Sequence, residues 1–317
     1  MPAPSIDVHA HALPQSYVDG MDALGVNPAQ EDGFPTPPWS EEAQLAFMDS
    51  TNQEFAVLSL STPHIHRGDE DLAVKIARSI NDDVSAICRR HPDRLGFATT
   101  LPLPAVQASI DEARRGFEEL GALGVKVPSN ANGVYLGDPS FEPLFQYLDE
   151  VGAVVTIHPS LAKQAPQGIF TAGPAPLFEY IVDTTRAVLN LMANGVIERY
   201  PNVKIIVPHS GSFIPPIAHR LIGISQVLIP KGMMEPIDVM GNLKSLYWDL
   251  AGDATPVMLE GLLKIADPSH LLYGADFPYT PEPMVLNKKA SLEADPFVQE
   301  HLDEIFRGNA KRIYGLE

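Results

Sequence analysis

The sequence predicts an α/β protein that folds as a single (β/α)8 TIM barrel over residues 1–317, with long loops at the C-terminal face. Three observations predict this fold. Short apolar runs alternate with amphipathic segments along the whole chain, there are eight such runs, and the connections after them are longer than those before them. Strands that alternate with helices pair in parallel, and eight strand–helix units close a barrel.

The eight apolar runs are short and bounded by turn-forming residues, as strands are. They cover residues 6–11, 55–61, 95–101, 124–127, 153–158, 203–209, 246–250 and 271–276. Between them, apolar residues at helical spacing predict helices over residues 69–90, 105–120, 186–199 and 256–266.

The loops distinguish the two ends of this barrel. Connections from helix into strand are short and carry glycine, proline or asparagine, whereas residues 12–40, 159–183 and 210–216 form longer, proline-rich segments after strands. In this fold the carboxyl ends of the strands carry the chemistry. We therefore expect the active site among these longer loops, with no domain boundary elsewhere in the chain.

The charge balance and the single cysteine restrict the possible partners and compartment. Lys and Arg number 22 against 40 Asp and Glu, a net charge of −18, which argues against nucleic acid or an anionic membrane as a partner. Cys88 cannot form an intrachain disulfide, so the chain suits a reducing compartment. No signal-peptide pattern and no apolar run of ~18 residues is found, so we expect a cytoplasmic protein.

Five metal-competent side chains stand in or at the ends of predicted strands. His9 and His11 are two residues apart in the first strand, and therefore point to the same face. His158, His209 and Asp276 end three later strands, whose carboxyl ends meet at one face of a barrel. Imidazole and carboxylate groups suit zinc and similar divalent cations. The alternatives are buried core histidines, and a helix N-cap for Asp276.

The motifs around these residues resemble those of the amidohydrolase superfamily. They are Asp7-Val8-His9-Ala10-His11, His158-Pro159, His209-Ser210-Gly211 and Gly274-Ala275-Asp276-Phe277-Pro278. More narrowly, they resemble the branch of aminocarboxymuconate-semialdehyde decarboxylase and the metal-dependent decarboxylases of salicylate-type acids. The resemblance extends from residue 6 to residues 308–315, and residues 38–40, 129–138 and 183–186 are most similar to the 6-methylsalicylate decarboxylase group.

The resemblance implies that His9, His11, His158 and Asp276 hold the metal and that His209 lies beside it as a catalytic residue. Three imidazoles and one carboxylate leave an open coordination position, as a catalytic zinc site requires. We expect one divalent metal, Zn²⁺, with Mn²⁺ as the alternative. Some relatives bridge two metals with a lysine on the fourth strand, but the branch resembled here does not, so Lys126 is interpreted as a carboxylate partner or a surface residue.

The activity implied is non-oxidative decarboxylation of a small aromatic acid with an ortho hydroxyl group, in which Asp276 carries a proton to the ring and His209 assists it. The same residues could instead hydrolyse a lactone or an amide, because the metal ligands alone do not select the reaction. A non-catalytic barrel is the third hypothesis, and it leaves the retained metal-competent residues without a purpose.

Substrate contacts are predicted from position. Arg220 lies where the semialdehyde decarboxylase carries an arginine that crosses a dimer interface, so the resemblance implies a homodimer. His64 follows the second predicted strand, in a loop expected to face the site. Four aromatic residues lie in loops on the active face, and they either wall an aromatic substrate or fill the mouth of the barrel: Trp39, Phe170, Phe213 and Tyr279. That decarboxylase has further arginines where residues 31–59 of this chain have none, which disfavours a dicarboxylate substrate.

Overall fold

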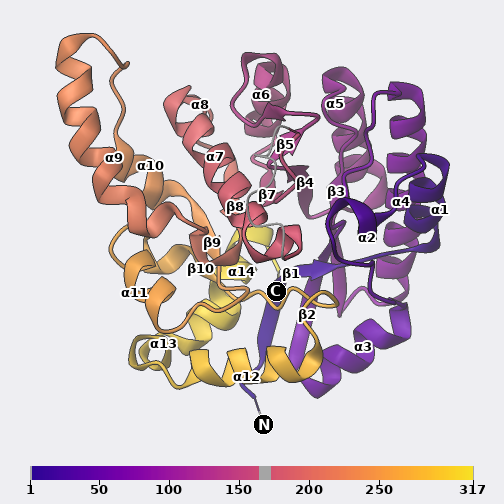
Figure 1. Cartoon of the computed structure of the whole chain (residues 1–317). Helices are drawn as coiled ribbons and strands as arrows, with labels where there is room; N and C mark the ends of the chain where they lie inside the picture. The colour runs from indigo at the N-terminus through magenta and orange to yellow at the C-terminus, as the bar shows by residue number, and fades with distance from the viewer. Residues whose placement is uncertain (1, 164–172, 317) are drawn as a thin grey trace.

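The structure, a computed structural model, describes residues 2–163 and 173–316, which form a (β/α)8 barrel (Figure 1). Its eight-stranded sheet has the order β1-β2-β3-β4-β7-β8-β9-β10, and all neighbouring pairs in this order run parallel. These strands are β1 (Ser5–His11), β2 (Gln53–Ser59), β3 (Leu95–Thr100), β4 (Gly124–Pro128), β7 (Val154–His158), β8 (Lys204–Val207), β9 (Tyr247–Asp249) and β10 (Leu271–Leu272).

Backbone hydrogen bonds close the barrel between its last strand and its first. The Val8 amide donates to the Tyr273 carbonyl, and the Asp276 amide donates to the His9 carbonyl. All eight predicted strands are present, although β8 and β10 end earlier than expected. His209 and Asp276 follow these two strands with φ of 55° and 60°, a left-handed conformation that cannot continue a strand.

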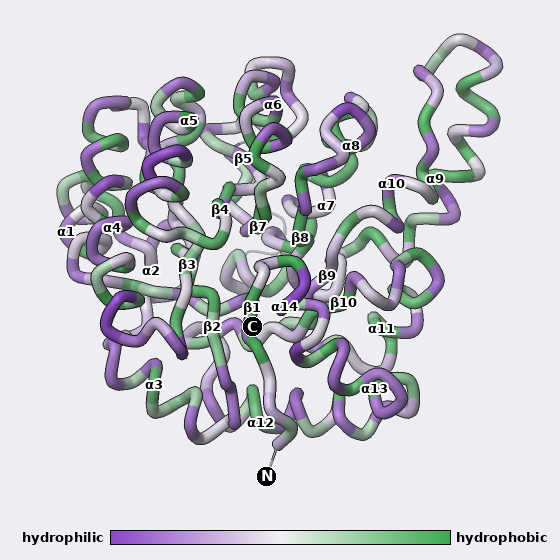
Figure 2. The backbone as a smooth tube through the Cα atoms, turned by 180° about the vertical axis from the view of Figure 1, so that it is seen from behind, coloured by the Kyte–Doolittle hydropathy of each residue, from purple (hydrophilic) through white to green (hydrophobic). Residues whose placement is uncertain are grey.

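The helices surround the sheet in Figure 1, and in Figure 2 hydrophobic and hydrophilic residues alternate along them, as expected for elements that bury one face. Strands β5 (Asn130–Ala131) and β6 (Val134–Tyr135) form a small antiparallel pair outside the barrel. The helices are α1 (Gln15–Ala23), α2 (Pro28–Glu31), α3 (Glu41–Ser50), α4 (Glu70–Arg90), α5 (Val106–Arg115), α6 (Glu142–Glu150), α7 (Glu179–Ala193), α8 (Val196–Arg199), α9 (Ile214–Leu228), α10 (Val239–Ser245), α11 (Val257–Leu262), α12 (Glu282–Glu293), α13 (Pro296–Glu300) and α14 (Asn309–Tyr314).

Three of the four predicted helices are confirmed in place. Helix α4 is capped by Asp69, whose side chain accepts from the Leu72 amide, and a π-helical turn continues α5 to Leu120. Helix α11 lies within residues 256–266 but is shorter than that range. The single helix predicted over residues 186–199 is wrong. Helix α7 begins earlier and α8 is separate, because Gly195 between them has φ of 65° and breaks the helix.

The loop after β1, residues 12–40, contains α1 and α2 and reaches the loop after β7. The Ala175 amide donates to the Asp32 carbonyl at 2.8 Å. Two segments far apart in the sequence thus meet above the carboxyl ends of the strands. In the part of the chain that the structure describes, no helix combines the length and the apolar character needed to cross a membrane.

Candidate active site

The structure brings four of the predicted metal-competent residues together at the carboxyl end of the barrel. His9 and His11 lie at the end of β1, His158 ends β7, and Asp276 follows β10. One ligand atom from each lies within 4.8 Å of the other three. The three imidazoles are buried, so they are held in place by the core and not by solvent-exposed loops.

The hydrogen bonds of the three histidines orient the same ring nitrogen toward the centre of this cluster. In each case Nδ1 faces an oxygen acceptor on the outside, so that Nε2 points toward the centre, where its lone pair could bind a metal ion. Such an outer acceptor is typical of metal-binding histidine. The acceptors are Asp249 Oδ2 for His9 at 2.8 Å, the Ser59 carbonyl for His11 at 3.3 Å and the Pro159 carbonyl for His158 at 3.1 Å.

The charges around His9 fit a divalent cation. Its Nε2 is buried and has no hydrogen-bond partner among the described residues. Burial alone lowers the pKa of His9, but the neighbouring carboxylates of Asp249, Asp276 and Asp7 outweigh burial and raise this pKa to about 9. These three carboxylates therefore favour a positive charge at the centre of the cluster. Burial holds the pKa of His158 well below its usual range, so this imidazole stays neutral, as a ligand must.

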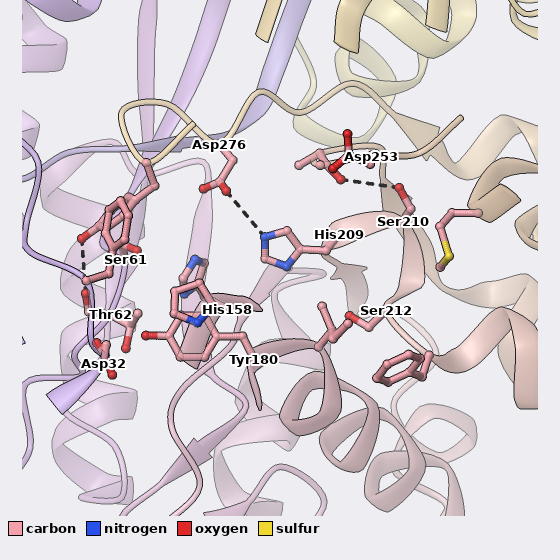
Figure 3. A pocket seen from close by; sticks show the side chains of 18 residues that line it. Asp32, Ser61, Thr62, His158, Tyr180, His209, Ser210, Ser212, Asp253 and Asp276 are labelled. Atoms are coloured by element: carbon pink, nitrogen blue, oxygen red, sulfur yellow. Dashed lines mark hydrogen bonds and ion pairs between the residues drawn. The ribbon is translucent and has the colours of Figure 1, made fainter. Parts of the chain in front are cut away.

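The two oxygens of Asp276 face different neighbours. Oδ1 lies 3.1 Å from His11 Nε2 and 3.5 Å from His9 Nε2, inside the ligand cluster. Oδ2 lies 3.8 Å from His209 Nε2, on the cavity side (Figure 3). Burial raises the pKa of Asp276, but the neighbouring imidazoles of His11 and His209 together hold it well below its usual value. The carboxylate of Asp276 can thus face the cluster through Oδ1 and the cavity through Oδ2.

His209 differs from the other three histidines. Its Nδ1 is buried without a partner among the described residues, and it does not belong to the ligand cluster. Its backbone amide donates to Asp249 Oδ1 at 3.0 Å. His209, Ser210 and Asp276 all have positive φ, which is uncommon for residues other than glycine and is concentrated at functional sites.

Two carboxylates that support the cluster were not predicted from the sequence. Asp249 bonds both the His9 ring and the His209 amide. Asp7 accepts from the amides of His9 at 2.9 Å and Ala275 at 3.0 Å, joining the first strand to the last. Both carried a signal, because Asp249 ends the seventh strand and Asp7 shares the inward face of β1 with His9.

Beside the cluster lies a cavity of about 330 Å³, the active-site cavity, large enough for one substituted ring. His158, His209 and Asp276 line one part of it (Figure 3). Phe213 and Tyr279 line it as predicted. The other apolar side chains of the lining are Phe34, Pro176, Ile181, Ala251 and Met258.

Three predicted substrate contacts, His64, Arg220 and Trp39, do not line this cavity. His64 is buried outside this cavity, and its Nε2 contacts the Leu103 carbonyl at 2.8 Å. Arg220 is exposed, because its position on α9 turns it away from the barrel of its own chain. Trp39 is also outside the cavity and bonds Gln44, and Phe170 lies outside the described residues.

The interpretation of Lys126 as a carboxylate partner or a surface residue is wrong. It is 1% exposed, and its Nζ donates to the Ser61 carbonyl at 3.0 Å. Burial lowers its pKa to about 7. Lys126 lies on β4 opposite Thr156 of β7, and its side chain is on the inner face of the barrel.

Asp32 and Tyr180 line the active-site cavity and were also missed. Asp32 is 4% exposed, and burial raises its carboxyl pKa to about 6, against the influence of the nearby Tyr180 hydroxyl. No sequence pattern marks this carboxylate, because it lies in a loop and reaches the cavity only through contacts between loops.

Asp32→Asn is expected to stabilise the protein above pH 6. The folded state holds the Asp32 proton to higher pH than the unfolded chain, so wild-type stability falls as pH rises from about 4 to about 6. A shift of about two pKa units corresponds to at most about 3 kcal/mol. The variant avoids this cost, so thermal unfolding should give it a higher Tm at pH 8 and a smaller advantage at pH 5. An equal or lower Tm at pH 8 would contradict the burial of an ionised carboxylate.

The chain is similar to known proteins in both sequence and structure. A family model described as amidohydrolase matches residues 6–316. The chain is 32% identical to a decarboxylase of Aspergillus niger, yanB, over 98% of this chain and 87% of that protein, and 31% identical to the 6-methylsalicylic acid decarboxylase of Penicillium expansum, over 98% and 95%. The crystal structure of an amidohydrolase II, 34% identical, superimposes with a TM-score of 0.92 over 98% of this chain and 99% of the other.

Proposed function

The chain belongs to the amidohydrolase family, and within that family we propose that it is a metal-dependent carboxy-lyase that removes carbon dioxide, without oxidation, from a small aromatic acid with an ortho hydroxyl group. One combined observation carries this proposal. A cluster of three histidines and one aspartate lies beside a ring-sized cavity, and the chain aligns over nearly its full length with decarboxylases.

We propose that His9, His11, His158 and Asp276 hold one divalent cation, with zinc expected and manganese as the alternative. The support is the common orientation of the three Nε2 atoms and the unpartnered Nε2 of His9. When bound, the cation supplies a Lewis acid for the substrate's carboxylate and phenolic oxygens.

The chain's own residues then provide the proton and the pocket. Asp276, which is ionised at rest, takes a proton from His209 on Oδ2 and delivers it to the ring carbon that carries the carboxylate. The bond from that carbon to the carboxylate then breaks, its electron pair returns to the ring, and carbon dioxide leaves. His209, 3.8 Å from Asp276 Oδ2, is placed to orient this carboxyl group and to return its proton for the next cycle. Phe213 and Tyr279 pack against the ring and exclude water from it.

Turnover in heavy water tests the reaction directly. Protonation of the ring carbon is expected to leave one deuterium where the carboxylate was, and mass spectrometry with proton NMR locates it. Hydrolysis of a lactone or an amide leaves that position unlabelled and instead adds an oxygen from ¹⁸O-labelled water. A product that contains the solvent oxygen would contradict decarboxylation.

We also propose a homodimer in which Arg220 reaches the neighbouring subunit's site. The support is that Arg220 is exposed on α9 and absent from the cavity of its own chain, and that α9 projects from the barrel in Figure 1. Ile224 and Val227, about half exposed on the same helix, offer apolar surface for a partner.

Mixing two inactive variants tests this arrangement. Arg220→Ala and His209→Ala are each expected to be nearly inactive, and an exchanged mixture should recover about a quarter of the wild-type activity, because half of its dimers hold one intact site. Verified subunit exchange without recovery would remove Arg220 from the partner's site. Sedimentation of the wild type at several concentrations supplies the oligomeric state independently.

A further inference from the structure

One part of the active-site cavity is polar and is not used by the mechanism above. Figure 3 shows Asp32, Thr62 and Tyr180 gathered there, away from Asp276. Asp32 is 4% exposed and Tyr180 6% exposed. Neither Asp32 Oδ1 nor the Tyr180 hydroxyl has a hydrogen-bond partner within the described residues. Buried polar atoms are almost always paired in folded proteins. The Tyr180 hydroxyl lies near enough to Asp32 and Thr62 to influence the pKa of Asp32, and a donor that enters the cavity would supply Asp32 Oδ1 with a full hydrogen bond.

The lining has acceptors but lacks cations. Among the described residues that line the cavity there is no lysine or arginine, and three are aspartates, Asp32, Asp253 and Asp276. A second carboxylate placed beside Asp32 would face a buried carboxylate with no lysine or arginine of the same chain lining the cavity. A hydroxyl or amino group would instead donate a hydrogen bond to a buried carboxylate, which is one of the stronger neutral-to-charged contacts in proteins.

We propose that Asp32, with Tyr180 beside it, binds a second hydrogen-bond donor on the aromatic ring. This inference rests on the proposed function and narrows its substrate class. The preferred acids are salicylates that carry a further ring hydroxyl or amino group, and not dicarboxylates or salicylates whose second substituent is a methyl group.

The surroundings of Asp32 hold its side chain in place for this role. Its own backbone carbonyl is tied to the Ala175 amide, and the preceding residue, Glu31, forms an ion pair with Arg67 at 2.6 Å. The loop is thus anchored without the Asp32 carboxylate. With a pKa of about 6, raised by burial, the carboxylate is mainly ionised at neutral pH and acts only as an acceptor.

The test compares matched substrates on the metal-loaded full chain. The isomeric dihydroxybenzoates with a 2-hydroxyl group are each paired with the salicylate that has a methyl group at the same ring position, and kcat/KM is measured for both. For at least one position the wild type should prefer the hydroxyl by about 10-fold or more. Asp32→Ala should reduce that ratio about 10-fold, mainly through KM, while the methyl compound changes little.

Three further variants separate recognition from structure. Tyr180→Phe should lower the same ratio by a smaller factor. Asp32→Asn has nearly the shape of the wild type, so it carries the test if Asp32→Ala fails to fold. Asp22→Asn removes a charge from the same loop, at an exposed position that does not line the cavity, and its ratio should equal that of the wild type. Calorimetric titration with dihydroxybenzenes and cresols, the matching products, should show the same preference in binding alone.

The outcomes distinguish failure of this inference from failure of the proposed function. If no aromatic acid loses carbon dioxide, the proposed function fails, and the calorimetric preference still decides the role of Asp32. If salicylates react but the wild type does not favour any hydroxylated isomer, or if the preference survives Asp32→Ala, the inference is overturned.

Discussion

His158→Ala is expected to purify with little bound metal and with turnover reduced to near the detection limit. This imidazole contributes one of the four converging side-chain atoms proposed as ligands, and alanine offers no atom in its place. Elemental analysis and kcat under saturating metal are the two measurements. Excess Zn²⁺ or Mn²⁺ should restore little activity, because the ligand is missing and not merely weakened.

His209→Ala is the matched control, since it removes an imidazole of the same site that lies outside the ligand cluster. It should retain wild-type metal content and lose about 10²–10⁴-fold in kcat, the usual range for a general acid–base group. Loss of metal from His209→Ala would show that His209 is a ligand. Full metal occupancy in His158→Ala would remove His158 from the ligand set.

Asp249→Asn should show an intermediate effect, since Asp249 supports the His9 ring and the His209 amide without entering the ligand cluster. Loss of such an outer partner typically lowers metal affinity or activity about 10–100-fold.

A benzoate without the ortho hydroxyl should react about 10⁴-fold more slowly than the matching salicylate. The hydroxyl supplies both a second oxygen for the metal and the electron release that allows the ring carbon to accept a proton. A site built to engage a hydroxyl rejects an analogue without it by about this factor. Comparing kcat/KM for benzoate and salicylate, each with the same second substituent, isolates the effect.

Two controls accompany this comparison. A meta-hydroxy isomer has the same composition but cannot present its carboxylate and hydroxyl together, so it should be as poor as the benzoate. The 2-methoxy analogue retains most of the electron release and loses the ionisable oxygen, which separates the two contributions. Similar rates for the ortho- and meta-hydroxy acids would contradict the proposed chemistry.

The strands and the ligand cluster could be predicted because their signals are local. Alternation of apolar residues marks a strand without knowledge of the rest of the chain, and the i, i+2 spacing places His9 and His11 on one face. The barrel rule then brings the strand ends of His158 and Asp276 to the same place. Helix ends were less predictable, since the break at Gly195 depends on one backbone conformation.

The sequence by itself therefore determined the barrel and the end of the barrel at which the metal-competent side chains converge. Only the tertiary structure decided that Lys126 is buried, that Asp249 joins His9 to His209, and that Arg220 faces away from its own cavity. It also placed Asp32 in the cavity through a contact with Ala175, which is 143 residues away in the chain. Such contacts depend on how loops pack against each other, and no periodic pattern within a loop encodes them.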